Sequence, residues 1–166
     1  MCIRDSADTV YFGAEAEFYM FDEIRYSVTP GHSFYSIDSE EAAWNTGREE
    51  LGGNLGYKSP MNGGYYASGP QDKDADIRDE MSLTLESIGF EMERAHHECG
   101  TAGQQEINYK FATLQKAGDQ LLDFKYIVRS VAEQWGKTVT FMPRPLMNDS
   151  GSGMHCHQSP VSYTHL

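Results

Sequence analysis

Apolar and polar residues alternate with a period of two from Val10 to Phe21, which predicts a β-strand. Glu15, Glu17 and Tyr19 fall on one face of this strand, and the opposite face carries Ala14, Ala16, Phe18 and Met20. Because alternate residues of a strand share a face, two carboxylates are expected to lie side by side.

Two later segments repeat apolar residues at helical spacing. Residues 72–88 carry the stripe Ile77, Met81, Leu85 and Ile88, with acidic residues in the first turn and Gly89 available to end the helix. A longer helix is predicted from Thr113, a candidate N-cap, to Gly136. Its stripe comprises Leu114, Leu121, Phe124, Val128, Val131 and Trp135.

The remaining chain predicts strands and irregular connections. Alternation over Phe90–Glu98 and the β-branched run Lys137–Met142 indicate two more strands. Between Asp22 and Pro70, the turn signals Pro30-Gly31, Gly52-Gly53 and Gly63-Gly64 indicate hairpins and long loops. A Gly/Ser loop from Asn148 leads into a short strand ending at Ser159, with His155 and His157 on one face and Cys156 on the other. Strands separated by long helices predict a layered α+β domain.

Composition narrows the class of protein. The 166 residues suffice for one domain, and 13 basic against 25 acidic residues give a formal net charge of −12, which argues against a nucleic-acid partner. No apolar run is long enough for a membrane helix, and no signal peptide is evident. The three cysteines form no recognisable disulfide or zinc framework, so we expect a cytoplasmic protein.

The two ends carry an unusual relation. Residues 1–6 can be encoded by a DNA sequence whose reverse complement encodes the end of Pro160 followed by residues 161–165. An inverted repeat of this kind resembles the mosaic end of a sequencing-library transposon. We therefore expect residues 1–6 and 160–166 to be translated adapter, and residues 7–159 to be the genuine protein.

Three places offer ligands for a hard divalent cation, which prefers carboxylate oxygens. The first is Glu15 and Glu17, although such a pair is usually a solvated strand face. The second is His96-His97-Glu98 with Glu106, a segment that by itself is more often a surface hairpin. The third is His155 with His157, which resembles a zinc pair, but Cys156 between them points away.

Taken together, the motifs resemble those of type I glutamine synthetases. They occur in the same order, and the resemblance covers nearly all of residues 11–159. The motifs are GAEAEFYMF, IDSEEAAWNTG, GGYY, AHHECGTAGQQEINYKF, GKTVTFMPRP and DSGSGMHCHQS. The resemblance implies part of that family's catalytic domain, an α+β fold in which helices pack on an antiparallel sheet. It also implies ATP-dependent ligation of ammonia to L-glutamate through a γ-glutamyl phosphate.

The resemblance assigns roles to individual residues. Two Mg²⁺ or Mn²⁺ ions are implied, the first held by Glu17, Glu98 and Glu106 and the second by Glu15, His155 and a glutamate beyond this chain. Nucleotide contacts are implied for Glu93, for the strand Tyr109-Lys110-Phe111, and for His157 and Ser159.

The matching positions for glutamate are Ser150 and Gly151. Tyr65 is implied at the ammonium pocket with Glu98 nearby. Ser150 stands where the family has Asn, which puts strict glutamate specificity in doubt.

Two other functions remain compatible with these residues: a related ligase that joins glutamate to a different amine, and a non-catalytic structural relative. The family's active sites form between subunits of a dodecamer, so the resemblance implies a homo-oligomer. It also implies further parts, before and after these residues, that complete the active site. We therefore expect the isolated polypeptide to lack synthetase activity.

Overall fold

The computed structural model describes residues 7–45 and 54–162. The predicted adapter segment 1–6 lies outside these residues, as do residues 163–166 and the predicted turn at Gly52-Gly53. The elements are β1 (Thr9–Ala16), β2 (Phe18–Phe21), β3 (Glu23–Thr29), β4 (His32–Asp38), α1 (Ala75–Ser87), β5 (Met92–His97), β6 (Gln104–Tyr109), β7 (Ala112–Thr113), α2 (Leu114–Gln134), β8 (Thr138–Thr140) and β9 (Met154–Val161).

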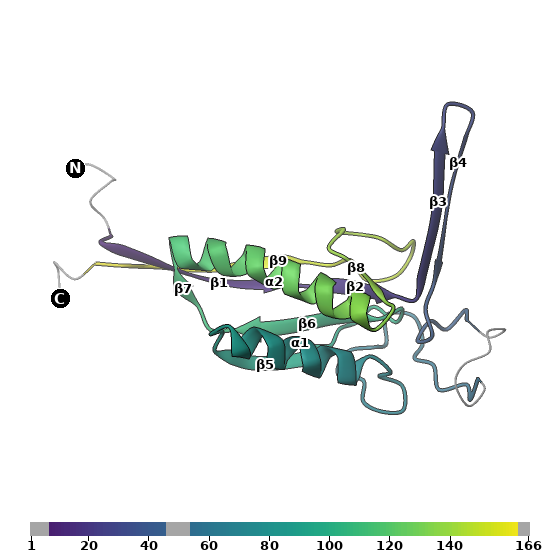
Figure 1. The fold of residues 1–166 in the computed structure, drawn as a ribbon, viewed down its shortest axis with the longest axis horizontal. Coiled ribbons are helices and arrows are strands. Elements are labelled where there is room, and N and C mark those ends of the chain that lie inside the picture. The colour runs from purple at the N-terminus through teal and green to yellow at the C-terminus, as the bar shows by residue number, and fades with distance from the viewer. Residues whose placement is uncertain (1–6, 46–53, 163–166) are drawn as a thin grey trace.

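The strands form two antiparallel sheets and a separate hairpin (Figure 1). One sheet has the order β7-β1-β9 and the other the order β5-β6-β2-β8. The α+β prediction is therefore confirmed. The single strand predicted for Val10–Phe21 is wrong in one respect, because the chain breaks at Glu17 and passes from the first sheet into the second. All four residues of β2 are buried, so the alternation ends at this break.

Two helices pack against each other and against the sheets, and both were predicted. Ile77, Met81 and Leu85 of α1 face Phe124 and Val128 of α2 in one buried cluster with Phe18, Met20, Ile107 and Tyr109. Burial of this apolar surface is the main stabilising contribution to the fold.

The ends of the predicted helical stripes were placed wrongly. Ile88, Leu114 and Trp135 are exposed, and each lies at an end of its helix: Leu114 is the first residue of α2, and Ile88 and Trp135 are the C-caps of α1 and α2. Thr113 precedes α2 but makes no side-chain capping hydrogen bond. Gly89 and Gly136 follow the two helices with positive φ angles of 96° and 72°, which confirms them as terminators.

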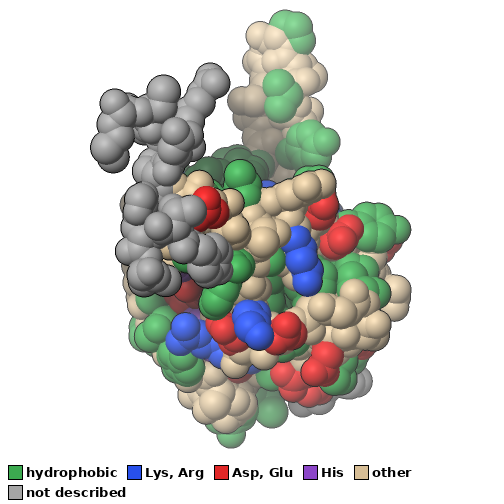
Figure 2. All heavy atoms as spheres, turned by 90° about the vertical axis from the view of Figure 1, so that its left-hand side faces the viewer, with side chains coloured by type: hydrophobic (Ala, Val, Ile, Leu, Met, Phe, Trp, Pro, Cys, Tyr) green, Lys and Arg blue, Asp and Glu red, His purple; other side chains and the backbone are tan. Residues whose placement is uncertain are grey.

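The hairpin of β3 and β4 projects away from the body of the molecule, as Figure 1 shows. Its turn lies at the predicted Pro30-Gly31. Several of its large apolar side chains are exposed, including Tyr26 and Val28, and apolar groups are visible on it in Figure 2.

Two further boundaries differ from the sequence-based expectation. The strand expected at Tyr109-Lys110-Phe111 is wrong, because β6 ends at Tyr109 and Lys110 and Phe111 connect it to β7. The strand expected to end at Ser159 continues to Val161, with Pro160 and Val161 opposite Val10 and Thr9. The adapter origin of residues 160–166 stays a prediction. No helix among the described residues is long and apolar enough to cross a membrane.

Candidate metal and substrate site

A buried group of one imidazole and two carboxylates lies where β5 and β6 pair. His96 is directly opposite Glu106 in the ladder, and Glu98 follows the end of β5. The His96 Nε2 atom lies 2.9 Å from Glu98 Oε1 and 3.3 Å from Glu106 Oε2. One ligand atom from each residue lies within 4.8 Å of the others. The interpretation of this segment as a surface hairpin is therefore wrong, because His96, Glu98 and Glu106 are buried and their side chains converge.

Neighbouring donors orient both carboxylates. The Cys99 N–H donates to Glu98 Oε2 at 2.9 Å, and the Asn108 amide donates to Glu106 Oε1 at 2.8 Å. Outer hydrogen bonds of this kind fix the direction of metal-binding carboxylates. Two buried carboxylates this close repel each other unless a cation or a proton lies between them, so the donor set fits a hard divalent cation.

The two carboxylates differ in their proton affinity. Burial would raise the pKa of Glu98, but the hydrogen bonds from the Cys99 N–H and from His96 outweigh it, and the pKa is lowered. Burial raises the pKa of Glu106 and the neighbouring Glu98 adds to this, against the opposing Asn108 hydrogen bond. A proton shared by the pair therefore favours Glu106.

His96 belongs to a segment that the sequence singled out, but no role was assigned to it there. Period-two alternation places it on the same face as Glu98, which is the signal that indicates it. Its Nδ1 atom is buried with no hydrogen-bond partner among the described residues, whereas metal-binding histidines almost always donate from the second nitrogen. His96 therefore suits the role of a donor to the carboxylates better than that of a metal ligand.

Aromatic rings cover this histidine. Tyr66 stacks on His96 with ring centroids 4.6 Å apart, and Tyr65 contacts it edge-on at 5.7 Å. Tyr65 is more than half exposed, so its hydroxyl is accessible next to the carboxylate group. The structure thus brings Tyr65 close to Glu98, as the resemblance implies.

Glu17 lies at the break between β1 and β2 and faces a second part of the site. Its Oε2 atom accepts hydrogen bonds from the Gly153 N–H at 2.9 Å and from the Gln104 amide at 3.0 Å. It lines a cavity of about 550 Å³ together with Glu98, Ser150, Gly151 and Arg144.

The loop carrying Ser150 is anchored from both sides. The Ser150 hydroxyl donates to Asn62 Oδ1 at 2.8 Å, and the Ser150 main-chain carbonyl accepts from the Tyr19 hydroxyl at 2.6 Å. Burial raises the pKa of the Tyr19 hydroxyl, as do the nearby charges of Asp149 and Glu17, so this donor stays protonated. The main chain of Ser150 and Gly151 is thereby held at the cavity wall.

A second, open group spans β1 and β9. The carboxylate of Glu15 lies 3.3 Å from His155 Nδ1 and 3.1 Å from His157 Nε2. The ladder pairs Glu15 with His155 and Gly13 with His157, so both imidazoles reach one carboxylate. This group offers a cation one carboxylate and two imidazoles, whereas the buried group offers two carboxylates beside one imidazole.

Most of the residues implied in nucleotide binding surround two adjoining cavities. Glu93, Tyr109, Phe111 and His157 line one of about 190 Å³ together with Glu15. Phe111, His157 and Ser159 also line a larger one of about 510 Å³. The side chain of Lys110 is not brought to either cavity, because its ammonium pairs with Glu91 at 2.6 Å on the surface.

This chain is similar to known proteins of one family. The family model "Glutamine synthetase, catalytic domain" matches residues 3–164. Glutamine synthetases of Streptomyces filamentosus and Frankia alni are 58% and 55% identical over 153 residues. In both cases the match covers 92% of this chain but 32% of the relative, so the chain spans about a third of their length.

A solved structure shows the same fold. The cryo-electron-microscopy structure of Plasmodium falciparum glutamine synthetase matches with a TM-score of 0.85 and 29% identity, covering 96% of this chain and 32% of that one. With the family model matching nearly the whole chain, the protein belongs to the glutamine synthetase catalytic-domain family.

Proposed function

We propose that this chain forms part of an enzyme that ligates ammonia to the side-chain carboxylate of L-glutamate at the expense of ATP. The observation that supports this most strongly is the buried pair Glu98 and Glu106, which converges with orienting donors on both carboxylates. A protein without bound cations gains nothing from burying such a pair.

Two Mg²⁺ or Mn²⁺ ions complete the proposed site. Glu17, Glu98 and Glu106 would hold the first, and Glu15 with His155 would hold the second. When bound, such ions neutralise the phosphates of ATP and orient the transferring phosphoryl group.

The cavities around these groups are proposed to hold the substrates. Glu93, Tyr109, Phe111, His157 and Ser159 would bind ATP, with Lys110 contributing through its main chain. Ser150 and Gly151 would bind glutamate in the cavity that Glu17 and Glu98 also line.

In the proposed reaction, the γ-phosphoryl group passes from ATP to the glutamate side chain and ADP leaves. Ammonia then attacks the γ-glutamyl phosphate and phosphate departs, which yields glutamine. Glu98 and Tyr65 would bind ammonium beside the acyl group, because a carboxylate and a hydroxyl adjoin there. The protein's contribution is mainly positioning and charge stabilisation.

A graft tests the proposal. Residues 7–159 would replace the matching segment of the Streptomyces filamentosus glutamine synthetase, which is 58% identical. We expect glutamine formation from glutamate, ammonium and ATP, lost on Glu98→Ala and kept on Glu91→Ala, an exposed carboxylate outside the site. A correctly assembled graft that makes no glutamine would contradict the proposal.

A ligase acting on another amine is the second candidate, and Ser150 favours it. Ser150 lines the cavity where the family has Asn, and its hydroxyl donates to Asn62 Oδ1 at 2.8 Å. The same graft tested with methylamine, ethylamine and hydroxylamine distinguishes the two, since a preference for an alkylamine over ammonium would identify this alternative.

The non-catalytic relative is tested by metal binding. Equal Mn²⁺ affinity of the wild-type chain and Glu98→Ala would favour this alternative and defeat the proposed site. A cytoplasmic homo-oligomer is proposed for the longer protein, and sedimentation of the graft tests the oligomeric state.

A further inference from the structure

A buried ion pair adjoins Glu98, one of the carboxylates proposed to bind a metal ion. His97 Nε2 is 2.7 Å from the carboxylate of Glu41, and both side chains are almost completely buried. The two residues are 56 positions apart in the chain. Neither residue lines the cavities proposed to hold glutamate and ATP.

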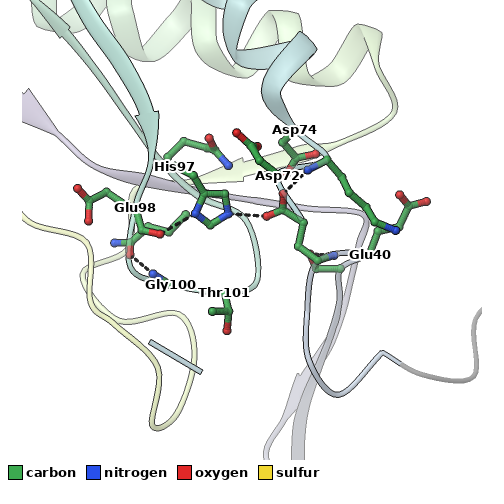
Figure 3. Close-up of polar contacts among 12 residues, drawn as sticks. Glu40, Asp72, Asp74, His97, Glu98, Gly100 and Thr101 are labelled. Atoms are coloured by element: carbon green, nitrogen blue, oxygen red, sulfur yellow. Dashed lines mark hydrogen bonds and ion pairs between the residues drawn. The ribbon is translucent and has the colours of Figure 1, made fainter. Parts of the chain in front are cut away.

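The other nitrogen of the same ring faces the main chain of a proposed ligand. His97 Nδ1 donates to the carbonyl of Glu98 at 2.6 Å, so the ring has an acceptor on each side (Figure 3). Because both nitrogens face acceptors, the ring has one well-defined orientation. The Glu98 carbonyl and the Cys99 N–H belong to the same planar peptide unit, so fixing the carbonyl also fixes the N–H that orients the Glu98 carboxylate.

The partner of this histidine is itself held in place. The second oxygen of Glu41 accepts the Lys73 N–H at 2.7 Å, at the entrance to α1. Glu41 therefore joins the loop after β4 to the start of a helix and to the end of β5. A carboxylate with both oxygens engaged in a buried setting has little freedom to move.

The segment from His97 to Cys99 also contacts the loop that carries Tyr65. The Tyr66 N–H donates to the His97 carbonyl and the Gly64 N–H to the Cys99 carbonyl, both at 3.0 Å. A Cβ atom at Gly64 would lie 2.7 Å from the His97 ring and from the Glu98 carbonyl, so the loop packs directly on both.

We propose that Glu41 and His97 are a positioning pair, which fixes the main chain of Glu98 and the Gly64–Tyr66 loop and so sets the geometry of the metal and ammonium sites. This inference rests on the proposed function, because it assumes that Glu98 binds a cation. Neither residue touches substrate, so both act through Glu98.

Mn²⁺ titration of the full chain, followed by the electron paramagnetic resonance of the free ion, tests the pair. We expect Glu41→Ala and His97→Ala to weaken binding about tenfold, the range measured for outer-layer partners of metal ligands. Glu41→Gln retains a polar group that can bond the imidazole, so its affinity should lie near that of the wild-type chain.

A matched control separates positioning from general instability. Val128→Ala removes buried apolar contact in α2, a helix that carries none of the proposed ligands, and should lower the melting temperature without changing Mn²⁺ affinity. If Glu41→Ala binds Mn²⁺ as well as the wild-type chain, or Val128→Ala loses as much affinity as Glu41→Ala, the inference is wrong.

Amide hydrogen exchange gives a readout that does not depend on metal. Exchange at Gly64 and Tyr66 should accelerate in Glu41→Ala relative to the amides of α1, and should not in Val128→Ala. Unchanged exchange at these two amides would overturn the positioning role of Glu41 and His97 and would leave the proposed function untouched. Equal Mn²⁺ binding by the wild-type chain and Glu98→Ala would instead defeat the proposed function, and the exchange result would still decide the positioning role.

Discussion

The buried and the open groups of candidate ligands are built differently. The side chains of Glu98 and Glu106 are 11% and 9% exposed, whereas those of His155 and His157 are 61% and 70% exposed. Donors from Cys99 and Asn108 orient the buried carboxylates. In the open group, two imidazoles converge on Glu15 across a strand pair.

The difference teaches how each group would bind a cation. A buried, pre-oriented group gains affinity because its ligands lose little freedom on binding, and because charges interact strongly away from water. An open group on a two-strand ladder gains less, since water competes and exposed charges are screened. The buried group should therefore bind the first ion more tightly.

Removing a buried ligand should have the largest effect. Glu98→Ala takes away one of the two converging carboxylates, and we expect the tighter of the two Mn²⁺-binding steps to weaken about 100-fold. Loss of an outer partner of a metal ligand costs about 10- to 100-fold, and loss of a ligand itself should reach at least the top of that range. Titration by electron paramagnetic resonance measures this, with Glu91→Ala as the exposed control. If Glu98→Ala lost less Mn²⁺ affinity than His155→Ala, the open group would be the tighter one and the comparison would be reversed.

Acidification should weaken the buried site next. Burial raises the pKa of Glu106, and the cation needs the deprotonated carboxylate, so affinity is full above this pKa and falls as the pH drops through it. Below it, we expect about a tenfold loss for each pH unit. Mn²⁺ titrations across a pH series follow the curve.

Asn108→Leu sharpens this measurement. The Asn108 hydrogen bond lowers the pKa of Glu106, so its removal should raise that pKa and shift the affinity curve to higher pH. An unshifted curve would show that another group controls the pH dependence.

Gly64→Ala should perturb the buried group alone. A Cβ atom there would meet the Glu98 carbonyl at 2.7 Å, so the main chain must shift. Overpacking of this kind costs about 1–3 kcal/mol, and we expect about a fivefold loss in the tighter step. Gly31→Ala, which meets nothing within 4 Å, is the control. If Gly64→Ala instead lowered the affinity of the weaker Mn²⁺-binding step, Gly64 would support the open group around Glu15.

His155→Ala should have the smallest effect. The imidazole is largely exposed, and an exposed charged contact contributes less than about 1 kcal/mol, so we expect at most about a fivefold loss in the weaker step. The same titration measures it, with the hairpin residue His32→Ala as control. A loss in the tighter step would show that the two groups act as one.

Local patterns in the sequence were sufficient to predict much of the fold. The helical stripes of Ile77–Leu85 and Phe124–Val131 located both helices, because their apolar period matches the face that packs on the sheets. The ends of α2 were also predicted, since Thr113 precedes the helix and Gly136 follows it. The exposure of Leu114 and Trp135 was not predicted, because burial of an end residue depends on contacts with other elements.

The sequence by itself determined both helices, part of the strands and, through its motifs, the residues proposed to bind ions and substrates. Only the tertiary structure decided the break at Glu17, the burial of Glu98 with Glu106, and the contact of Glu41 with His97. The physical reason is range. A period of two or 3.6 residues reports local geometry, whereas a contact across 56 residues depends on how whole elements pack.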